Sequence, residues 1–250
     1  MVSSSARGSS ERPFYARHAE AYDLLITDPV EPWVGAVHDR LRSVGRTPAV
    51  VLDAGCGTGR HAAGLVAAGH RVDLVDASAD LLSLAVTRCP SARAISADLC
   101  ELDVPPVYDA VTCRGVLNDM ISDRERAAAV RSLAGCLNPG GLLFLDVREE
   151  RASQSRADGA THRRQVDLGD GARLTFTSRT TWSEGTLRVE EEYDLARPGM
   201  PEQRSGYTFA MQPWSEAELR AVLHDSGLRT VQISPGVGRR TADRLFVVAH

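Results

Sequence analysis

The chain contains no lysine, so all 29 of its basic residues are arginine. Against 33 acidic residues they leave a formal net charge of −4, without any excess of positive charge. A protein that binds nucleic acid needs a basic surface to neutralise phosphates. We therefore expect no nucleic acid among its partners, and we attribute the lack of lysine to coding bias.

Long apolar runs are also absent, since no stretch approaches the ~20 apolar residues of a membrane span. The five cysteines are scattered and odd in number, which predicts neither a disulfide framework nor a zinc site. Residues 1–12 are serine-rich and lack the apolar core of a signal peptide, so we expect them to form a disordered tail. Together these absences predict a cytoplasmic protein without a membrane partner.

The length of 250 residues suits one α/β domain, over residues 13–250, and the chain is organised around residues 49–59, AVVLDAGCGTG. An apolar run ends at Asp53, three closely spaced glycines follow, and residues 61–68 have the composition of a helix. This order predicts a strand, a glycine loop and a helix. Residues without a Cβ let a ligand approach the backbone, and the N–H groups at the start of the helix point towards it.

A second predicted strand, 71–75, ends at Asp76, whose carboxylate can accept hydrogen bonds from two ribose hydroxyls. A dinucleotide-binding loop would have glycine where this chain has Arg60. Asp53, just before the loop, would repel a diphosphate and attract a cation. The pattern therefore favours a positively charged nucleoside as the cofactor.

The segment from Asp53 to Gly59, DAGCGTG, resembles the first motif of class I S-adenosylmethionine-dependent methyltransferases. The small-molecule members with a β-hairpin lid, such as amino-sugar and glycine N-methyltransferases, are similar to this chain. The resemblance implies an α/β, Rossmann-like fold with a seven-stranded, mostly parallel sheet and helices on both faces. It also implies an antiparallel β insertion between strands five and six.

The same resemblance implies that a methyl group is transferred from S-adenosyl-L-methionine, leaving S-adenosyl-L-homocysteine, to the N or O of a small molecule in secondary metabolism. It also implies a set of cofactor-binding residues. These are Asp53, Gly55, Cys56, Gly57, Thr58, Gly59, Asp76, Ala77, Asp98, Leu99, Cys113 and Tyr15.

Residues 113–120 follow the fourth predicted strand and should face the transferred methyl, because ligands of parallel sheets lie beyond the carboxyl ends of the strands. Arg114 and Asn118 are expected to bind the acceptor. Asp119, Tyr22 and His18 are candidates to take up a proton. The alternative is that Asn118 or Asp119 caps the next helix. Asp119 and Asp146 could offer oxygens to magnesium, but no third ligand is evident, so we expect no metal.

Two further segments are expected to cover the site. Residues 13–45 predict two helices broken near Asp28, whose aromatic residues either line the site or pack against the domain. Residues 150–212 alternate as antiparallel hairpins, and Glu191 and Tyr207 lie on their apolar faces as candidate acceptor contacts. Glu191 could instead pair structurally. In the family this insertion covers the acceptor or builds a homodimer, so a homodimer is a further expectation.

Two other functions stay open on the sequence alone. A protein of the same fold could bind S-adenosylmethionine in a regulatory, non-methylating role. A nicotinamide oxidoreductase is disfavoured by Arg60, which stands where that class requires glycine.

Overall fold

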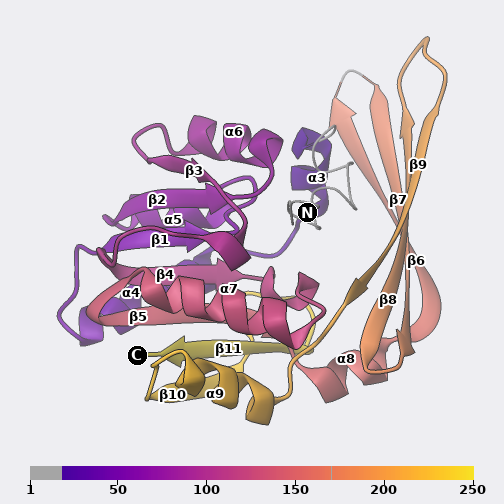
Figure 1. The fold of residues 1–250 in the computed structure, drawn as a ribbon. Coiled ribbons are helices and arrows are strands. Elements are labelled where there is room, and N and C mark those ends of the chain that lie inside the picture. Colours follow the sequence, from indigo (N-terminus) through magenta and orange to yellow (C-terminus); the bar gives the residue numbers. More distant parts are fainter. Residues whose placement is uncertain (1–18, 170) are drawn as a thin grey trace.

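The computed structural model describes residues 19–169 and 171–250, which form two sheets (Figure 1). The expected tail, Tyr15 and His18 lie outside these residues. The larger sheet has seven strands in the order β10-β11-β5-β4-β1-β2-β3, and only β11 runs antiparallel to its neighbours. Its strands are β1 Val50–Ala54, β2 Arg71–Asp76, β3 Ala94–Ser96, β4 Tyr108–Arg114, β5 Leu137–Arg148, β10 Val231–Pro235 and β11 Arg244–Ala249.

Helices cover both faces of this sheet, as expected. On one face lie α4 (Glu31–Ser43), α5 (Arg60–Ala67) and α6 (Ala79–Arg88), which bury a core around Trp33. On the other lie α7 (Asp123–Gly135) and α9 (Glu216–Asp225), which bury a second core around Trp214. Because both faces are covered, the central strands β1, β4 and β5 are buried along most of their length.

The smaller sheet is the expected insertion between the fifth and sixth strands of the large sheet. Its four antiparallel strands follow the order β6-β7-β8-β9, and Figure 1 shows them standing beside the parallel sheet with α3 (Ala19–Leu25) between the two. The strands are β6 Asp158–Gly169, β7 Ala172–Ser183, β8 Thr186–Ala196 and β9 Gln203–Met211. No helix in the described part of the chain is long and apolar enough to cross a bilayer.

The structure departs from the sequence expectations in several elements. Helix α8 (Glu150–Arg156) was not expected. Strand β6 extends well beyond the expected 165–168, because its mostly exposed first half also pairs with β7. Neither Asn118 nor Asp119 caps α7. Ser122 does so through a capping box with Glu125, while Asp119 lies in the short 3-10 helix η2 (Leu117–Asp119).

Candidate active site

A cavity of about 660 Å³ lies between the carboxyl ends of the parallel strands and the β6–β9 sheet. Its floor comes from residues after β1, β2, β3 and β4, and its opposite wall from β7, β8 and β9. The end of α3 and the following residues 26–28 close a third side. This volume is typical of a site that holds small ligands.

The glycine loop after β1 forms part of the cavity floor, and its glycines serve different purposes. Gly57 has φ +55°, and a Cβ there would meet no atom within 4 Å, so the missing side chain leaves space to a ligand. Gly59 has φ +78°, and a Cβ would lie 2.8 Å from Cα of Ala85. Gly59 therefore lets α5 approach α6 and does not line the cavity, although the sequence predicted it among the cofactor-binding residues.

Asp76, at the end of β2, holds the loop and faces the cavity. Its Oδ2 accepts a hydrogen bond of 2.8 Å from the Gly57 N–H, and its Oδ1 accepts one of the same length from the Ser78 N–H. Each carboxylate oxygen has a second lone pair, so both can still accept a hydroxyl of a ribose. This geometry fits the nucleoside part of S-adenosylmethionine.

Replacing Asp76 by alanine is expected to weaken S-adenosylmethionine binding by about 1–3 kcal/mol, because hydrogen bonds to a charged acceptor are lost. Calorimetry measures this as a rise in Kd of about ten- to a hundredfold. Asp80→Ala, on the exposed first turn of α6, is the matched control and should leave Kd unchanged. An unaltered Kd for Asp76→Ala would show that this carboxylate does not hold the ribose.

Asp53 lies one residue before the end of β1 and is only 4% exposed. Burial raises the pKa of Asp53 to about 6, and the nearby Asp76 carboxylate contributes to this rise. A hydrogen bond of 2.7 Å donated by the Thr112 hydroxyl acts in the opposite direction. The nearby Arg114 guanidinium offsets this rise only in part, so a sulfonium ligand would add a cation that stabilises the buried carboxylate. The residues around the loop thus fit a positively charged nucleoside.

The raised pKa of Asp53 predicts a pH dependence of cofactor binding. Folding favours the protonated form, so the contribution of Asp53 to stability is present below its unfolded pKa of 3.8 and is lost as pH rises through about 6. The Asp53 carboxylate becomes negatively charged over this pH range and can then attract a cation. We expect affinity for S-adenosylmethionine to rise up to about tenfold from about pH 5 to about pH 7.

S-adenosylhomocysteine, which lacks the sulfonium charge, is the control ligand and should show a smaller rise over the same range. Asp53→Asn should remove the difference between the two ligands. Equal slopes for both ligands on the unaltered protein would contradict a role of Asp53 in holding the sulfur cation.

Most of the other predicted cofactor residues also reach the cavity. They are Gly55, Cys56, Thr58, Ala77, Asp98 and Leu99. Asp98 also caps the short 3-10 helix η1 (Leu99–Glu101) through the Cys100 N–H at 2.8 Å. Cys113 is fully buried and is not among the lining residues. Burial raises the pKa of Cys56 and of Cys113, so both thiols stay protonated.

Four of the described acceptor and catalytic candidates line the same cavity: Asp119, Tyr22, Glu191 and Arg114. Two others do not. Asn118 is fully buried, where its Oδ1 accepts the Arg148 N–H at 2.7 Å and its Nδ2 donates to the Gly115 carbonyl. Tyr207 packs against Tyr193 in the core of the β6–β9 sheet, with ring centroids 6.0 Å apart.

His61 lines the cavity and was missed by the sequence reasoning. Burial lowers the pKa of His61 to about 2, assisted by Arg114, Arg239 and Arg60, so its imidazole is neutral. Its Nε2 has no hydrogen-bond partner among the described residues. Its place in the first turn of α5, directly after the glycine loop, is the signal that could have identified it.

Two arginines, from α5 and α6, form hydrogen bonds with α3 and with the residues that follow it. Arg60 donates to the carbonyls of Ile26 at 2.7 Å and Asp28 at 3.2 Å. Asp23, on α3, accepts from Arg88 and from the Thr58 hydroxyl. These bonds hold Tyr22 and residues 26–28 against the cavity, so the described part of the expected helical cover is fixed in place.

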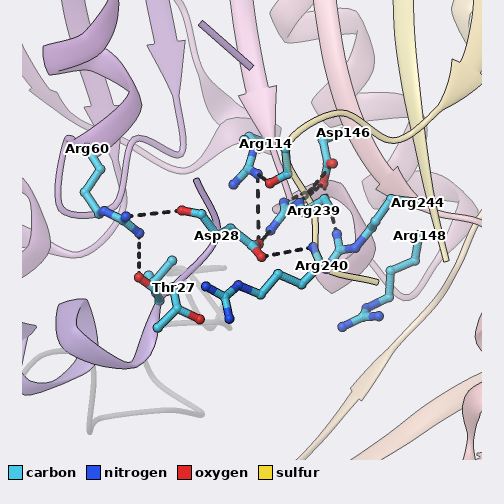
Figure 2. Close-up of polar contacts among 12 residues, drawn as sticks. Thr27, Asp28, Arg60, Arg114, Asp146, Arg148, Arg239, Arg240 and Arg244 are labelled. Atoms are coloured by element: carbon cyan, nitrogen blue, oxygen red, sulfur yellow. Dashed lines mark hydrogen bonds and ion pairs between the residues drawn. The ribbon is translucent and has the colours of Figure 1, made fainter. Parts of the chain in front are cut away.

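A cluster of arginines and acids, also unexpected from the sequence, borders the cavity beyond β4, β5 and β11 (Figure 2). Asp146 is fully buried and accepts hydrogen bonds from Arg239 at 2.5–3.1 Å and from Arg244 at 3.1 Å. Arg239 also reaches Asp28 at 3.0 Å. The Asp146 carboxylate therefore pairs with two guanidiniums. No group of three or more potential metal ligands forms among the described residues.

Comparisons with known proteins agree with this geometry. A methyltransferase domain model matches residues 51–141, from β1 to the start of β5. The cypemycin N-terminal methyltransferase of a Streptomyces species is 34% identical over 163 residues, which cover 63% of this chain and 65% of that protein. The dTDP-3-amino-3,4,6-trideoxy-alpha-D-glucopyranose N,N-dimethyltransferase of Streptomyces venezuelae is 26% identical over 89% of this chain and 94% of that protein.

Among solved structures, the S-adenosylmethionine-bound amino pentose methyltransferase CalS10 of Micromonospora echinaspora superposes with a TM-score of 0.73. It is 25% identical, and the match covers 93% of this chain and 95% of that one. These relatives do not favour the non-methylating alternative. The glycine loop, the two acids at its edge and these matches identify the chain as a class I S-adenosylmethionine-dependent methyltransferase.

Proposed function

We propose that the enzyme methylates the amine nitrogen of a small polar acceptor of the amino-sugar kind. The observation that carries this proposal is the pair of carboxylates, Asp119 and Glu191, on the walls of one cavity beside the glycine loop. Carboxylates attract the ammonium form of an amine and can take its proton. The amino-sugar and amino pentose methyltransferases among the relatives support the same acceptor class.

S-adenosylmethionine, when bound, supplies a methyl group already activated by a sulfonium sulfur. The task of the chain is then to hold the acceptor lone pair in line with that methyl group and to exclude water. The apolar side chains of Val189, Phe209 and Met211 on β8 and β9 form part of the wall opposite the glycine loop. Tyr22 adds an aromatic ring from α3.

Asp119 is the candidate proton acceptor because it borders two spaces. It lines the main cavity and also a groove of about 400 Å³ with Ile121, Ser183 and Arg188. A proton taken from the acceptor amine in the cavity can leave to solvent from the same carboxylate through this groove. Glu191 accepts a hydrogen bond of 2.7 Å from the Tyr193 hydroxyl, which orients it on the facing wall. Glu191 therefore suits binding of the ammonium form.

The proposal is tested with matched acceptors. The protein is incubated with S-adenosylmethionine and either a 3-amino-3,6-dideoxy sugar, free or dTDP-linked, or the same sugar with a hydroxyl in place of the amine. We expect S-adenosylhomocysteine and a methylated product from an amino sugar only. Equal or exclusive transfer to the hydroxyl analogue would contradict N-methylation.

The cellular location and oligomeric state stay proposals. All five cysteines are free, which supports the expected cytoplasmic location. A homodimer is the oligomeric state that we propose. Sedimentation of the purified protein at two concentrations tests it.

A further inference from the structure

The β6–β9 sheet joins the rest of the chain through residues 148–150, which precede it, and residues 212–214, which follow it. These two connections are bonded to each other. The Trp214 N–H donates to the Arg148 carbonyl at 2.8 Å, and the Glu150 N–H donates to the Trp214 carbonyl at 3.0 Å. Trp214 is fully buried. The entry and exit of the sheet therefore form one junction.

This junction also holds η2, the short 3-10 helix that contains Asp119. The Gln212 backbone N–H donates to the Asn118 carbonyl at 2.8 Å. In the amide orientation that gives both of its polar atoms a partner, the Gln212 side chain donates to the Ile121 carbonyl at 2.8 Å and accepts from Arg126 at 2.9 Å. Gln212 thus bonds to the backbone on both sides of Asp119.

Asn118 adds contacts from the other side of the junction. It is fully buried, its Oδ1 accepts the Arg148 N–H at 2.7 Å, and its Nδ2 donates to the Gly115 carbonyl at 3.2 Å. The Trp214 Nε1–H donates to the carbonyl of the preceding residue, Leu117, at 3.3 Å. The end of β4, the end of β5 and the exit of the β6–β9 sheet consequently meet at η2.

These outside contacts matter because η2 has little stability of its own. It is three residues long, and within it the Asp119 N–H donates to the Val116 carbonyl at 2.9 Å. A displacement of about 1 Å caused by a change away from the reacting atoms can cost about a hundredfold in rate. Met211, the residue before Gln212, lines the cavity. The junction therefore fixes the candidate base and the facing cavity wall relative to each other.

We propose that Gln212 and Asn118 are positioning residues that hold the Asp119 carboxylate in place for proton transfer. Neither of the two is among the residues that line the cavity, so they act through Asp119 and not on the acceptor. The inference rests on the proposed function, because it takes Asp119 as the group that accepts the proton of the amine. The β6–β9 sheet then has a second role besides covering the acceptor, which is to align the base.

The test is a double-mutant cycle between Gln212→Met and Asp119→Asn, with kcat measured at saturating S-adenosylmethionine and an amino-sugar acceptor. Methionine keeps the length of the Gln212 side chain and removes its two hydrogen bonds. We expect Gln212→Met to lower kcat about tenfold and to leave the Kd of S-adenosylhomocysteine unchanged. In the Asp119→Asn background the same change should alter kcat by less than about twofold, because the residue through which Gln212 acts is already disabled.

Gln165→Met is the matched control and should keep full kcat. Gln165 is an exposed glutamine on β6, whose Nε2 donates to the Thr175 hydroxyl at 3.2 Å. Asn118→Ala is the second variant. It should lower kcat with the same dependence on Asp119, and all rates are compared below the thermal midpoint of each variant. Full kcat in folded Gln212→Met, or the same fold-loss with and without Asp119→Asn, would overturn the positioning role.

This inference and the proposed function fail in different ways. A large loss in Asp119→Asn, with an equal and independent loss in Gln212→Met, would overturn the positioning role and leave Asp119 as the base. Methyl transfer to the hydroxyl analogue alone would contradict N-methylation, and it is read from the product and not from the cycle.

Discussion

Replacing Asp146 by asparagine is expected to destabilise the protein by about 3–5 kcal/mol. The carboxylate is fully buried and is the shared partner of Arg239 and Arg244, whose side chains are 11% and 10% exposed. Asparagine keeps the size of the side chain but removes the negative charge. Two guanidiniums would then remain in a poorly solvated region, with only Asp28 still paired to Arg239.

Denaturant unfolding of the two proteins measures this difference in the free energy of unfolding. Asp39→Asn is the control, because Asp39 is exposed and pairs with Arg42 on the surface, where the change should stay within about 0.5 kcal/mol. A loss below about 1 kcal/mol for Asp146→Asn would show that the buried arginines are solvated or paired in another way.

Replacing Asp119 by asparagine is expected to lower kcat by about a hundredfold or more, the usual contribution of a positioned general base. Asparagine retains the shape and hydrogen-bonding capacity of the side chain but cannot take a proton at neutral pH. Because Asp119 lies in η2 after β4 and not in the glycine loop, affinity for S-adenosylhomocysteine should change little.

Asp103→Asn, in the exposed loop after η1, is the matched control and should keep full activity. The thermal midpoint of both variants separates a chemical effect from unfolding. If Asp119→Asn has the kcat of the unaltered protein across the pH range, the acceptor amine loses its proton without this carboxylate, and Asp119 is not the base.

The sequence predicts best those features that local patterns carry. Ser78 before residues 79–88 predicted the cap and bounds of α6, and the structure confirms both. The glycine loop, with Asp53 before it and Asp76 after the next strand, predicted the cavity floor, because a short strand–loop–helix unit brings these residues together by itself. Alternation likewise predicted the β6–β9 sheet and the place of Glu191 on its apolar face.

Features that depend on contacts between distant segments could not be predicted in this way. Asn118 and Asp119 are neighbours in sequence but lie in different surroundings. The Asn118 side chain accepts a hydrogen bond from the Arg148 backbone N–H, whereas Asp119 lines the cavity. The arginine cluster joins residues 114 to 244 through the pairing of β4, β5 and β11. Arginines are common in this chain, so no local pattern distinguished those that gather there.

Gly59 shows a limit of motif reasoning. The resemblance assigned all three glycines of the loop to the cofactor. In the structure Gly59 is required by the close approach of Ala85 on α6, which lies outside the motif. A motif residue can therefore be needed for the helix packing that positions the site.

The central claim is that the loop from Asp53 to Gly59, together with Asp76, holds a sulfonium nucleoside. Calorimetric titration of the purified protein with S-adenosylmethionine and, separately, with NAD tests it most directly. The account predicts one S-adenosylmethionine per chain and no comparable affinity for NAD. Tighter binding of NAD, or no binding of S-adenosylmethionine, would contradict it.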